Sequence, residues 1–223
     1  MKSGNERVSP ALMREYLRMY LVIGSVNCLA DPVRVVEEAL AGGATLVQFR
    51  EKGPGALAGE DRLALALRLQ AACRRAGVPF IVNDDVDLAL EIGADGVHIG
   101  QDDEDAGAVR SRIGNRLLGV SAHTAGEARL AVSRGADYLG IGPIYPTASK
   151  ADAHAVQGPA ILRELRRSGI ALPLVGIGGI TAERAGEVVA AGADGVAVIS
   201  AVTGVPPGET RDAVRRILAG MVT

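Results

Sequence analysis

The segment AGADGVAVIS, residues 191–200, decides the fold of this chain. Gly192 supplies the left-handed turn that ends a helix, and Ala193 is small enough for the next strand to pack closely. The apolar run that follows predicts a short strand buried on both faces. The same turn recurs as Gly43-Ala44-Thr45, Gly93-Ala94-Asp95 and Gly135-Ala136-Asp137. This repetition predicts successive helix–turn–strand units, with the turns on the face of the fold that carries stability rather than catalysis.

Short apolar runs and longer amphipathic stretches alternate along the chain from residue 20. The predicted strands are Leu21–Ile23, Thr45–Phe49, Phe80–Val82, Gly96–Ile99, Leu117–Val120, Tyr138–Ile141, Leu174–Ile177 and Val196–Ile199. Helices are predicted over Pro32–Ala41, Ala56–Ala76, Ala125–Arg134, Gly158–Ser168 and Ala182–Ala191. Eight strands with intervening helices favour an α/β fold, a single closed (β/α)8 TIM barrel, over an open doubly wound sheet. Residues 20–223 form the barrel catalytic domain in this interpretation, and residues 1–19 an extra N-terminal helical segment.

The composition argues against several classes of function. Aromatic residues make up 3% of the 223 residues and Trp is absent, so platforms for stacking nucleobases are scarce. A net charge of −2, from 24 basic and 26 acidic groups, does not favour binding to nucleic acid or to an anionic membrane. No signal peptide is recognised, nor any apolar run approaching the ~20 residues that span a bilayer. Cys28 and Cys73 form no CxxC pair and are expected as free thiols, which predicts a soluble cytoplasmic protein.

Polar side chains follow the second predicted strand. Gln48, Arg50 and Lys52 alternate, so an extended chain projects all three toward one side. The active site of a (β/α)8 barrel lies at the carboxyl ends of its strands, where two cations and an amide suit a polyanion. The alternative for this segment alone is an ordinary solvated strand end.

Acidic residues follow the third and fourth predicted strands. Asp85, Asp102 and Glu104 are interpreted as residues that cap the next helix and favour its dipole. Asp84 and Asp103 differ, because they can converge from adjacent strands onto one cation. Two carboxylates completed by phosphate oxygens and waters are typical of a Mg²⁺ site.

The loops after the fifth and sixth strands carry hydroxyl groups. Ser121 and His123 are close in sequence, but no G-x-S-x-G elbow surrounds the serine, so we interpret it as a hydrogen-bonding residue rather than a nucleophile. Thr147, Ser149 and Lys150 lie in a loop stiffened by two prolines and suit a phosphorylated leaving group.

The last two strand ends predict a phosphate site. Gly176-x-Gly178-Gly179 follows the seventh strand and Ser200 the eighth, where barrels of this kind frequently bind phosphate. The spacing is not that of a dinucleotide fingerprint, so a phosphate monoester is the better ligand. The three histidines fit no metal-ligand spacing and are expected to be structural or to face solvent.

Together these segments closely resemble the thiamine phosphate synthase family, from about Tyr20 to the C-terminal helix. Any one motif is modest support, but seven in order on successive strands are highly specific. They are QFREK (48–52), VNDD (82–85), GVHIGQDD (96–103), GVSAHT (119–124), GPIYPT (142–147), GIGGI (176–180) and VIS (198–200).

The resemblance implies a role for each candidate residue. Residues implied to bind 4-amino-5-hydroxymethyl-2-methylpyrimidine diphosphate are Gln48, Arg50, Glu51, Lys52 and Asn83. Those implied to bind the phosphate of the thiazole partner are Thr147, Ser149, Gly179, Ile199 and Ser200, with Ser149 where the family usually has threonine. Asp84 and Asp103 are implied to bind Mg²⁺ that bridges the diphosphate. Ser121 and Lys150 are implied to contact the pyrimidine or its diphosphate, and with Arg50 and Lys52 they form the expected catalytic set.

The resemblance also implies a mechanism. Pyrophosphate leaves first, the aminopyrimidine stabilises the resulting carbocation, and the thiazole nitrogen attacks it. No protein nucleophile or base is required. Three alternatives stay open at this point: a thiazole tautomerase on the same barrel with His123 as its acid–base group, a non-catalytic phosphometabolite sensor, and a generic phosphosugar barrel enzyme. The sequence leaves the oligomeric state open, and a dimer is compatible with it.

Overall fold

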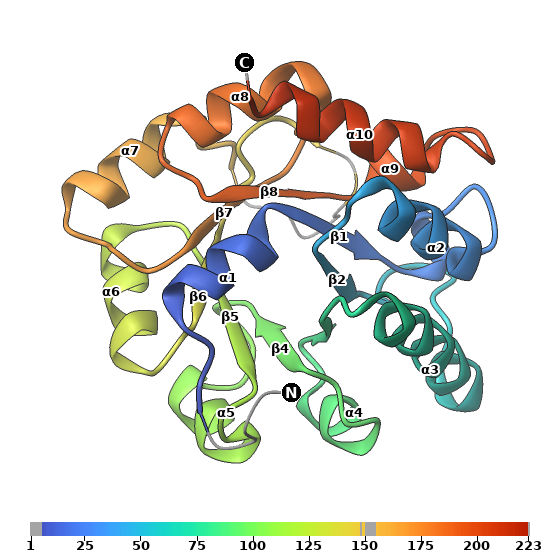
Figure 1. Ribbon diagram of the computed structural model, residues 1–223. Helices are drawn as coiled ribbons and strands as arrows, with labels where there is room; N and C mark the ends of the chain where they lie inside the picture. Colours follow the sequence, from blue (N-terminus) through green and yellow to red (C-terminus); the bar gives the residue numbers. More distant parts are fainter. Residues whose placement is uncertain (1–5, 148, 150–154, 223) are drawn as a thin grey trace.

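The computed structural model describes residues 6–147, 149 and 155–222, and in it eight parallel strands close into a barrel in sequence order (Figure 1). The strands are β1 (Met19–Ile23), β2 (Leu46–Phe49), β3 (Phe80–Asn83), β4 (Gly96–Ile99), β5 (Leu117–Ala122), β6 (Tyr138–Ile141), β7 (Leu174–Ile177) and β8 (Gly195–Val198). Pairing of Met19 with Val196 and of Leu21 with Val198 joins β1 to β8 and closes the ring. The predicted (β/α)8 barrel and all eight predicted strands are confirmed.

Helices surround the barrel on its outer face, except α1, which lies across one end (Figure 1). They are α1 (Pro10–Leu17), α2 (Pro32–Gly42), α3 (Gly59–Ala76), α4 (Val86–Glu91), α5 (Ala106–Ile113), α6 (Ala125–Ser133), α7 (Ala160–Arg167), α8 (Ala182–Ala190), α9 (Ser200–Thr203) and α10 (Thr210–Gly220), with a 3-10 turn at Ser25–Asn27. The five helices predicted with bounds are present. The helices expected after the third and fourth strands and at the C-terminus, for which no bounds were predicted, are α4, α5 and α10, and α9 was not predicted. Asp85 caps α4 by accepting from the Leu88 N–H at 2.8 Å, and Asp105 caps α5.

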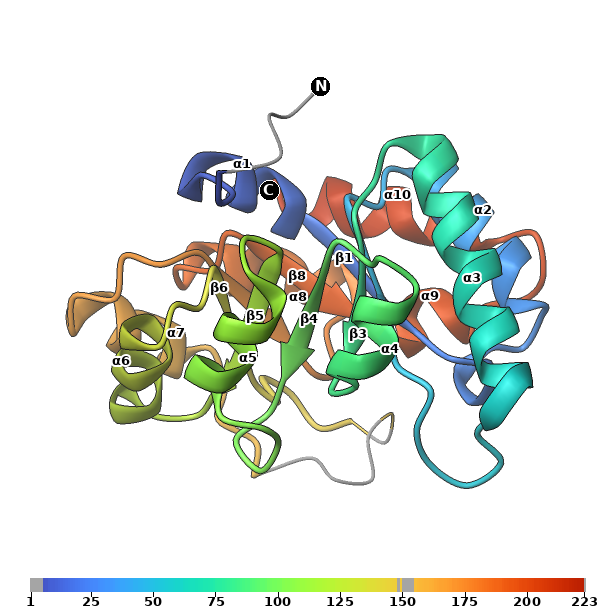
Figure 2. The same cartoon turned by 90° about the horizontal axis from the view of Figure 1, so that it is seen from below.

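The strands are buried on both faces, as their apolar runs predict. Outward side chains pack against the helices, while a second cluster that includes Tyr20, Leu46 and Tyr138 fills the barrel interior. Met13 and Leu17 of α1 belong to this interior cluster and are fully buried. Helix α1 lies across the end from which the strands start (Figure 2). The described part of the N-terminal segment, from residue 6 onward, is therefore packed on the barrel, where α1 covers the end opposite the predicted active site.

Two arginines attach this N-terminal segment to turns of the barrel. Arg7 contacts Asp137 at 2.6 Å and the carbonyl oxygen of Gly135 at 2.8 Å. Arg14 contacts Asp194 at 3.1 Å in the same way. Both aspartates are the third residue of a glycine–alanine–aspartate turn, so the repeated turn provides the docking points for residues that precede β1.

The repeated turns also satisfy backbone donors where odd-numbered strands begin. Asp95, Asp137 and Asp194 each accept a hydrogen bond from the N–H of a residue at the start of β3, β5 or β7, at 2.8–2.9 Å. Thr45 does the same for Met19 of β1 through its hydroxyl oxygen at 2.8 Å. A buried N–H without a partner is costly, so these side chains stabilise the barrel and lie at the end away from the site. Among the described residues, no helix is both long and apolar enough to cross a membrane.

Candidate active site

A cavity of about 690 Å³ opens at the carboxyl ends of the strands. Its lining comes from segments that follow seven of the eight strands, which matches the location of active sites in (β/α)8 barrels. Most of the residues predicted from the sequence line it together. They are Arg50, Lys52, Asn83, Asp84, Asp103, Ser121, Thr147, Ser149, Gly179, Ile199 and Ser200.

One side of the cavity carries a pair of carboxylates with a lysine beside them. Lys52 Nζ contacts Asp84 Oδ2 at 3.1 Å, and Asp103 accepts from the Gly100 N–H at 2.7 Å. Burial, followed by interaction with Asp103, raises the pKa of Asp84, while Lys52 opposes this shift. Asp84 also has a φ of 61°, a left-handed conformation in which Asp is better tolerated than most residues. The fold therefore holds two mutually repelling carboxylates close together, and Lys52 offsets the repulsion only in part, since the pKa of Asp84 remains raised.

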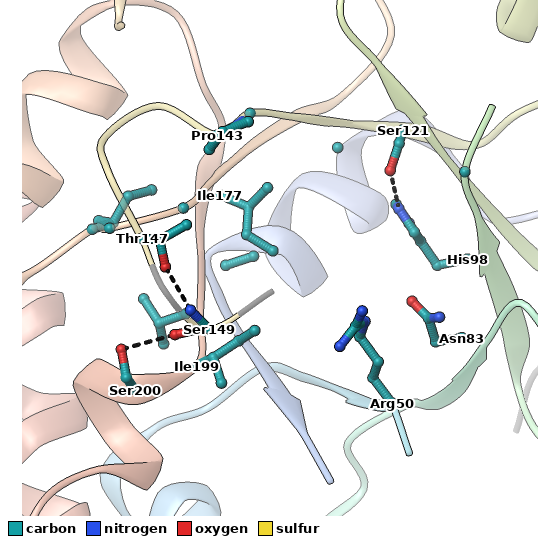
Figure 3. Close-up of a pocket in the computed structure, with 18 of the residues that line it drawn as sticks. Arg50, Asn83, His98, Ser121, Pro143, Thr147, Ser149, Ile177, Ile199 and Ser200 are labelled. Carbon is teal, nitrogen blue, oxygen red and sulfur yellow. Dashed lines mark hydrogen bonds between the residues drawn. The ribbon is translucent and has the colours of Figure 1, made fainter. Parts of the chain in front are cut away.

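Beneath this side, a chain of hydrogen bonds crosses the barrel interior. Gln48 Nε2 donates to the Tyr20 hydroxyl at 2.8 Å, and the Tyr20 and Tyr138 hydroxyls lie 2.8 Å apart. His98 joins Tyr138 to Ser121, at 3.0 Å from Nδ1 to the phenol and 3.0 Å from Nε2 to the serine hydroxyl (Figure 3). Burial raises the pKa of both phenols, so they stay protonated.

The order of donors in this chain follows from its Gln48 end. Because Tyr20 accepts from the amide, its own proton goes to Tyr138, whose proton goes to Nδ1 of His98. His98 then carries its proton on Nε2 and donates to Ser121. The serine hydroxyl is left with its proton available for a molecule in the cavity.

Sequence reasoning missed this chain, because it treated His98 as structural and did not single out either tyrosine. A signal existed in two glycines inside buried strands. A Cβ on Gly119 would lie 2.2 Å from Tyr138 Cζ and 2.4 Å from His98 Nδ1, and a Cβ on Gly140 would lie 2.9 Å from His98 Cε1. These strand glycines make room for the two rings.

The opposite side of the cavity is lined by hydroxyl groups and glycine backbone. Figure 3 shows Thr147, Ser149 and Ser200 together there, across the cavity from Arg50 and Asn83. The Ser149 hydroxyl donates to the Ser200 hydroxyl at 3.2 Å, and the Ser149 N–H donates to Thr147 Oγ1 at 3.2 Å. Side chains from two loops that are far apart in sequence therefore converge, as predicted.

The backbone after β7 adds donors to this side. The carbonyl oxygens of Ile177 and Gly178 accept from the N–H groups of Ile144 and Tyr145 at 2.8 and 3.0 Å. No described residue accepts from the N–H groups of Gly178, Gly179 or Ile180. Unpaired N–H groups beside hydroxyls form a suitable site for an oxyanion.

Some predicted residues lie elsewhere. Gln48 is 2% exposed and lies beneath the cavity rather than in its lining. Glu51 does not line the cavity either, because its carboxylate accepts from the Ser25 N–H at 2.7 Å and from the Leu57 N–H at 2.9 Å. It joins the loops after β1 and β2. Lys150 lies outside the described residues.

Among the residues interpreted as helix caps and the histidines, some line the cavity and others do not. Asp85 caps α4 as expected, and Glu104 forms an ion pair with Arg112. Asp102, by contrast, lines the cavity, as do His98 and His123. His123 Nδ1 lies 3.1 Å from Glu127, on the rim between β5 and α6.

The fold and the cavity define a class of protein, a (β/α)8 barrel whose site has two different sides. One side carries carboxylates and cations. The other, called the phosphate side below, carries the hydroxyl groups of Thr147, Ser149 and Ser200 and the backbone N–H groups that follow β7. Residues 19–202 match the family model described as thiamine monophosphate synthase, and this chain belongs to that family.

Two relatives named thiamine-phosphate synthase agree with this assignment. The protein from Geobacillus kaustophilus is 61% identical over 200 residues, 90% of each chain, and that from Bacillus velezensis is 58% identical over 197 residues, 88% of each chain. A solved structure of thiamine phosphate pyrophosphorylase from Pyrococcus furiosus superimposes with a TM-score of 0.83 at 34% identity, covering 94% of this chain and 98% of that one.

Proposed function

We propose that this protein is a transferase that condenses 4-amino-5-hydroxymethyl-2-methylpyrimidine diphosphate with 4-methyl-5-(2-hydroxyethyl)thiazole phosphate to form thiamine phosphate. The thiazole nitrogen forms a bond to the exocyclic methylene carbon of the pyrimidine. The bond from that carbon to the diphosphate oxygen breaks, and pyrophosphate leaves with the bonding electron pair. Beyond family membership, the observation that carries this proposal is one cavity with two chemically different anion sites on opposite sides.

The pyrimidine diphosphate occupies the side at β2–β4. Arg50 and Lys52 offer cations to the diphosphate, and Asn83 offers both a donor and an acceptor to the pyrimidine. With the donor order inferred from Gln48, His98 donates to the Ser121 oxygen, and the serine hydroxyl proton is then available to a molecule in the cavity. Glu51 and Gln48 act indirectly, the first by joining two loops and the second by fixing the hydrogen-bond chain.

Asp84 and Asp103 hold Mg²⁺. The residues fit this ion because their donors are carboxylate oxygens, and the raised pKa of Asp84 reflects a burial and repulsion that a cation relieves. Among the described residues, no group of three or more His, Cys, Asp or Glu could hold a metal. The remaining ligands of the proposed Mg²⁺ site would be substrate oxygens and water. When bound, the ion supplies charge neutralisation for the diphosphate.

Bond cleavage precedes bond formation in the mechanism we propose. Arg50 and Lys52 stabilise the negative charge that develops on pyrophosphate, and we assign the same role to Lys150 from the sequence alone. The aminopyrimidine delocalises the positive charge on the methylene carbon. Thr147, Ser149, Gly179, Ile199 and Ser200 hold the thiazole phosphate, so the ring nitrogen is positioned for attack. No proton needs to leave the thiazole nitrogen, so no protein base is assigned.

The proposed partners are these small molecules, in the cytoplasm. Cys28 and Cys73 are free thiols, which suits a reducing compartment. Burial raises the pKa of each to about 12, so both stay protonated and unreactive at neutral pH.

The test is to mix the purified protein with both substrates and Mg²⁺ and to follow thiamine phosphate and pyrophosphate. We expect equal amounts of both products, none with EDTA, and recovery when Mg²⁺ is added back. Asp84→Ala and Lys150→Ala should each lower turnover by orders of magnitude, and near-normal turnover in both would refute the assigned site. If the folded wild-type protein forms no product, an assay for thiazole isomerisation decides whether the tautomerase alternative holds.

A further inference from the structure

Arg184, in the first turn of α8, lines the cavity beside the glycines that follow β7. Its Nη1 donates to the carbonyl oxygen of Gly179 at 2.9 Å, and its guanidinium carbon lies 4.6 Å from the centre of the Tyr145 ring. The Tyr145 hydroxyl donates to Glu187 at 2.6 Å, which fixes the ring. Two uncharged groups therefore hold the guanidinium in place at the edge of the phosphate side.

No described carboxylate forms an ion pair with Arg184. The two acidic residues nearest in sequence have hydrogen-bond partners of their own: Glu187 accepts from Tyr145, and Glu183 accepts from the Thr181 hydroxyl at 2.6 Å. The hydrogen bond from Thr181 lowers the pKa of the exposed Glu183, and Arg184 contributes to this shift, so the charges of Glu183 and Arg184 attract each other without forming an ion pair. A guanidinium has five N–H donors, and within the described chain Arg184 uses one nitrogen. The remaining donors and the positive charge are available to an anion in the cavity.

The distribution of charge around the cavity points to the same conclusion. Arginine and lysine in the described lining are Arg50, Lys52 and Arg184. Lys52 is paired with Asp84 at the end of β3, and β3 lies four strands from β7 in the ring of eight. Without Arg184, the described part of the phosphate side offers hydroxyl and backbone donors alone to a group that carries a charge of about −2 at neutral pH.

We propose that Arg184 binds the phosphate of the thiazole substrate and selects the phosphorylated thiazole over the free alcohol. This inference rests on the function proposed above, since it assigns the charged partner of that substrate's phosphate. Arg184 also holds the Gly179 carbonyl, and because N–H and C=O point in opposite directions across a trans peptide, it orients the Ile180 N–H. The charge and this orientation act on the same oxyanion.

The first experiment compares steady-state kinetics of Arg184→Gln, Arg184→Lys and a matched control, Arg215→Gln. Arg215 is an exposed arginine of α10 that lies outside the cavity lining. Glutamine can still donate to the Gly179 carbonyl but carries no charge, whereas lysine keeps the charge. We expect Arg184→Gln to raise the KM for thiazole phosphate about 10- to 100-fold. The KM for the pyrimidine diphosphate and kcat at saturation should stay within about twofold of wild type, and Arg184→Lys should recover part of the loss.

The second experiment measures binding of thiazole phosphate and of the thiazole alcohol by calorimetry, with no turnover needed. Arg184→Gln should weaken the binding of thiazole phosphate by the same factor as it raises the KM for that substrate. The affinity for the thiazole alcohol should stay unchanged. A purely structural role predicts that glutamine restores binding, or that both ligands weaken equally, and either result overturns the inference. If wild type forms no thiamine phosphate, the proposed function fails, and the calorimetric comparison still decides the role of Arg184 separately.

Discussion

Tyr138→Phe should break the buried hydrogen-bond chain beneath the cavity while keeping the aromatic ring in place. The Tyr138 hydroxyl lies between the Tyr20 hydroxyl at 2.8 Å and Nδ1 of His98 at 3.0 Å. Tyr20 is 1% exposed, Tyr138 is fully buried and His98 is 8% exposed, so water does not readily replace the lost group. The substitution takes one hydrogen-bond partner from each of two buried groups. The Tyr20 hydroxyl proton loses its acceptor, although Gln48 Nε2 still donates to the Tyr20 oxygen, and His98 Nδ1 loses the Tyr138 phenol.

The magnitude follows from the number of groups that lose a partner. Each buried group that loses a partner costs about 1–3 kcal/mol, so the single substitution should lower the free energy of unfolding by about 2–6 kcal/mol. In a chain of this size, each kcal/mol shifts the melting temperature by roughly 2–4 °C. Tyr20→Phe should cost a similar amount, because Gln48 Nε2 loses its acceptor and the Tyr138 hydroxyl loses one of its two partners, keeping His98 Nδ1.

The double variant Tyr20→Phe/Tyr138→Phe gives the sharpest test. It takes a hydrogen-bond partner from two remaining groups, Gln48 Nε2 and His98 Nδ1, whereas the two single variants together take a partner from four. The loss in the double variant should therefore fall short of the summed single losses by about 2–6 kcal/mol. Chemical denaturation at constant pH measures all three values, and losses that add within about 0.5 kcal/mol would refute a continuous chain.

The remaining predictions concern the carboxylates, the N-terminal segment and the strand glycines. Asp84→Asn should abolish Mg²⁺-dependent turnover yet raise the melting temperature of the metal-free protein at neutral pH, because the fold raises the pKa of Asp84 and so favours its protonated form. The stability from that form is present at acid pH and is lost as pH rises through the raised pKa. The difference in melting temperature between variant and wild type should therefore grow with pH, and a constant difference contradicts it. Asp137→Asn removes the buried carboxylate that pairs with Arg110, which is 16% exposed, as well as with the more exposed Arg7. It should therefore destabilise by about 3–5 kcal/mol, mainly through Arg110, with both KM values unchanged in kinetics below the melting transition. Gly119→Ala should cost about 1–3 kcal/mol from overpacking and lower kcat by displacing His98, as denaturation and turnover assays can show.

The strands were predictable because parallel strands buried on both faces require short apolar runs, and the repeated turn marks where they begin. The helices whose bounds were not predicted were harder to recognise in the sequence. Helix α4 has six residues and α9 has four, which is too short for a helical period to stand out. The start of α4 was indicated by Asp85, which was interpreted as a helix cap although the bounds of the helix were not predicted. For α5, the cap Asp105 passed unnoticed among neighbouring acids.

The site also has a part that the sequence predicted and a part that it did not. Residues at strand ends were predictable, because the fold brings every carboxyl end to one face of the barrel. The chain of hydrogen bonds from Gln48 to Ser121 could not be predicted, because it depends on which side chains of different strands point inward at the same level. Tyr20 and Tyr138 are 118 positions apart, and only the strand register brings their hydroxyls together. Glu51 is an error in the opposite direction. It was predicted to bind substrate because it lies in a binding motif, but its carboxylate joins two loops.

Charge, more than shape, can explain how one cavity orients two phosphorylated substrates. A thiazole phosphate placed at the β2–β4 side would bring its negative charge toward Asp84 and Asp103, without the diphosphate that in the proposed site would help to hold Mg²⁺ there. Like charges about 4 Å apart repel by about 1 kcal/mol in water and about 4 kcal/mol at the effective dielectric of a protein surface. At the β6–β8 side the same phosphate meets hydroxyls, free N–H groups and Arg184, and no described carboxylate lines that side. The asymmetry therefore favours the one arrangement in which the thiazole nitrogen faces the pyrimidine carbon, and removing Arg184 weakens that preference from the thiazole side alone.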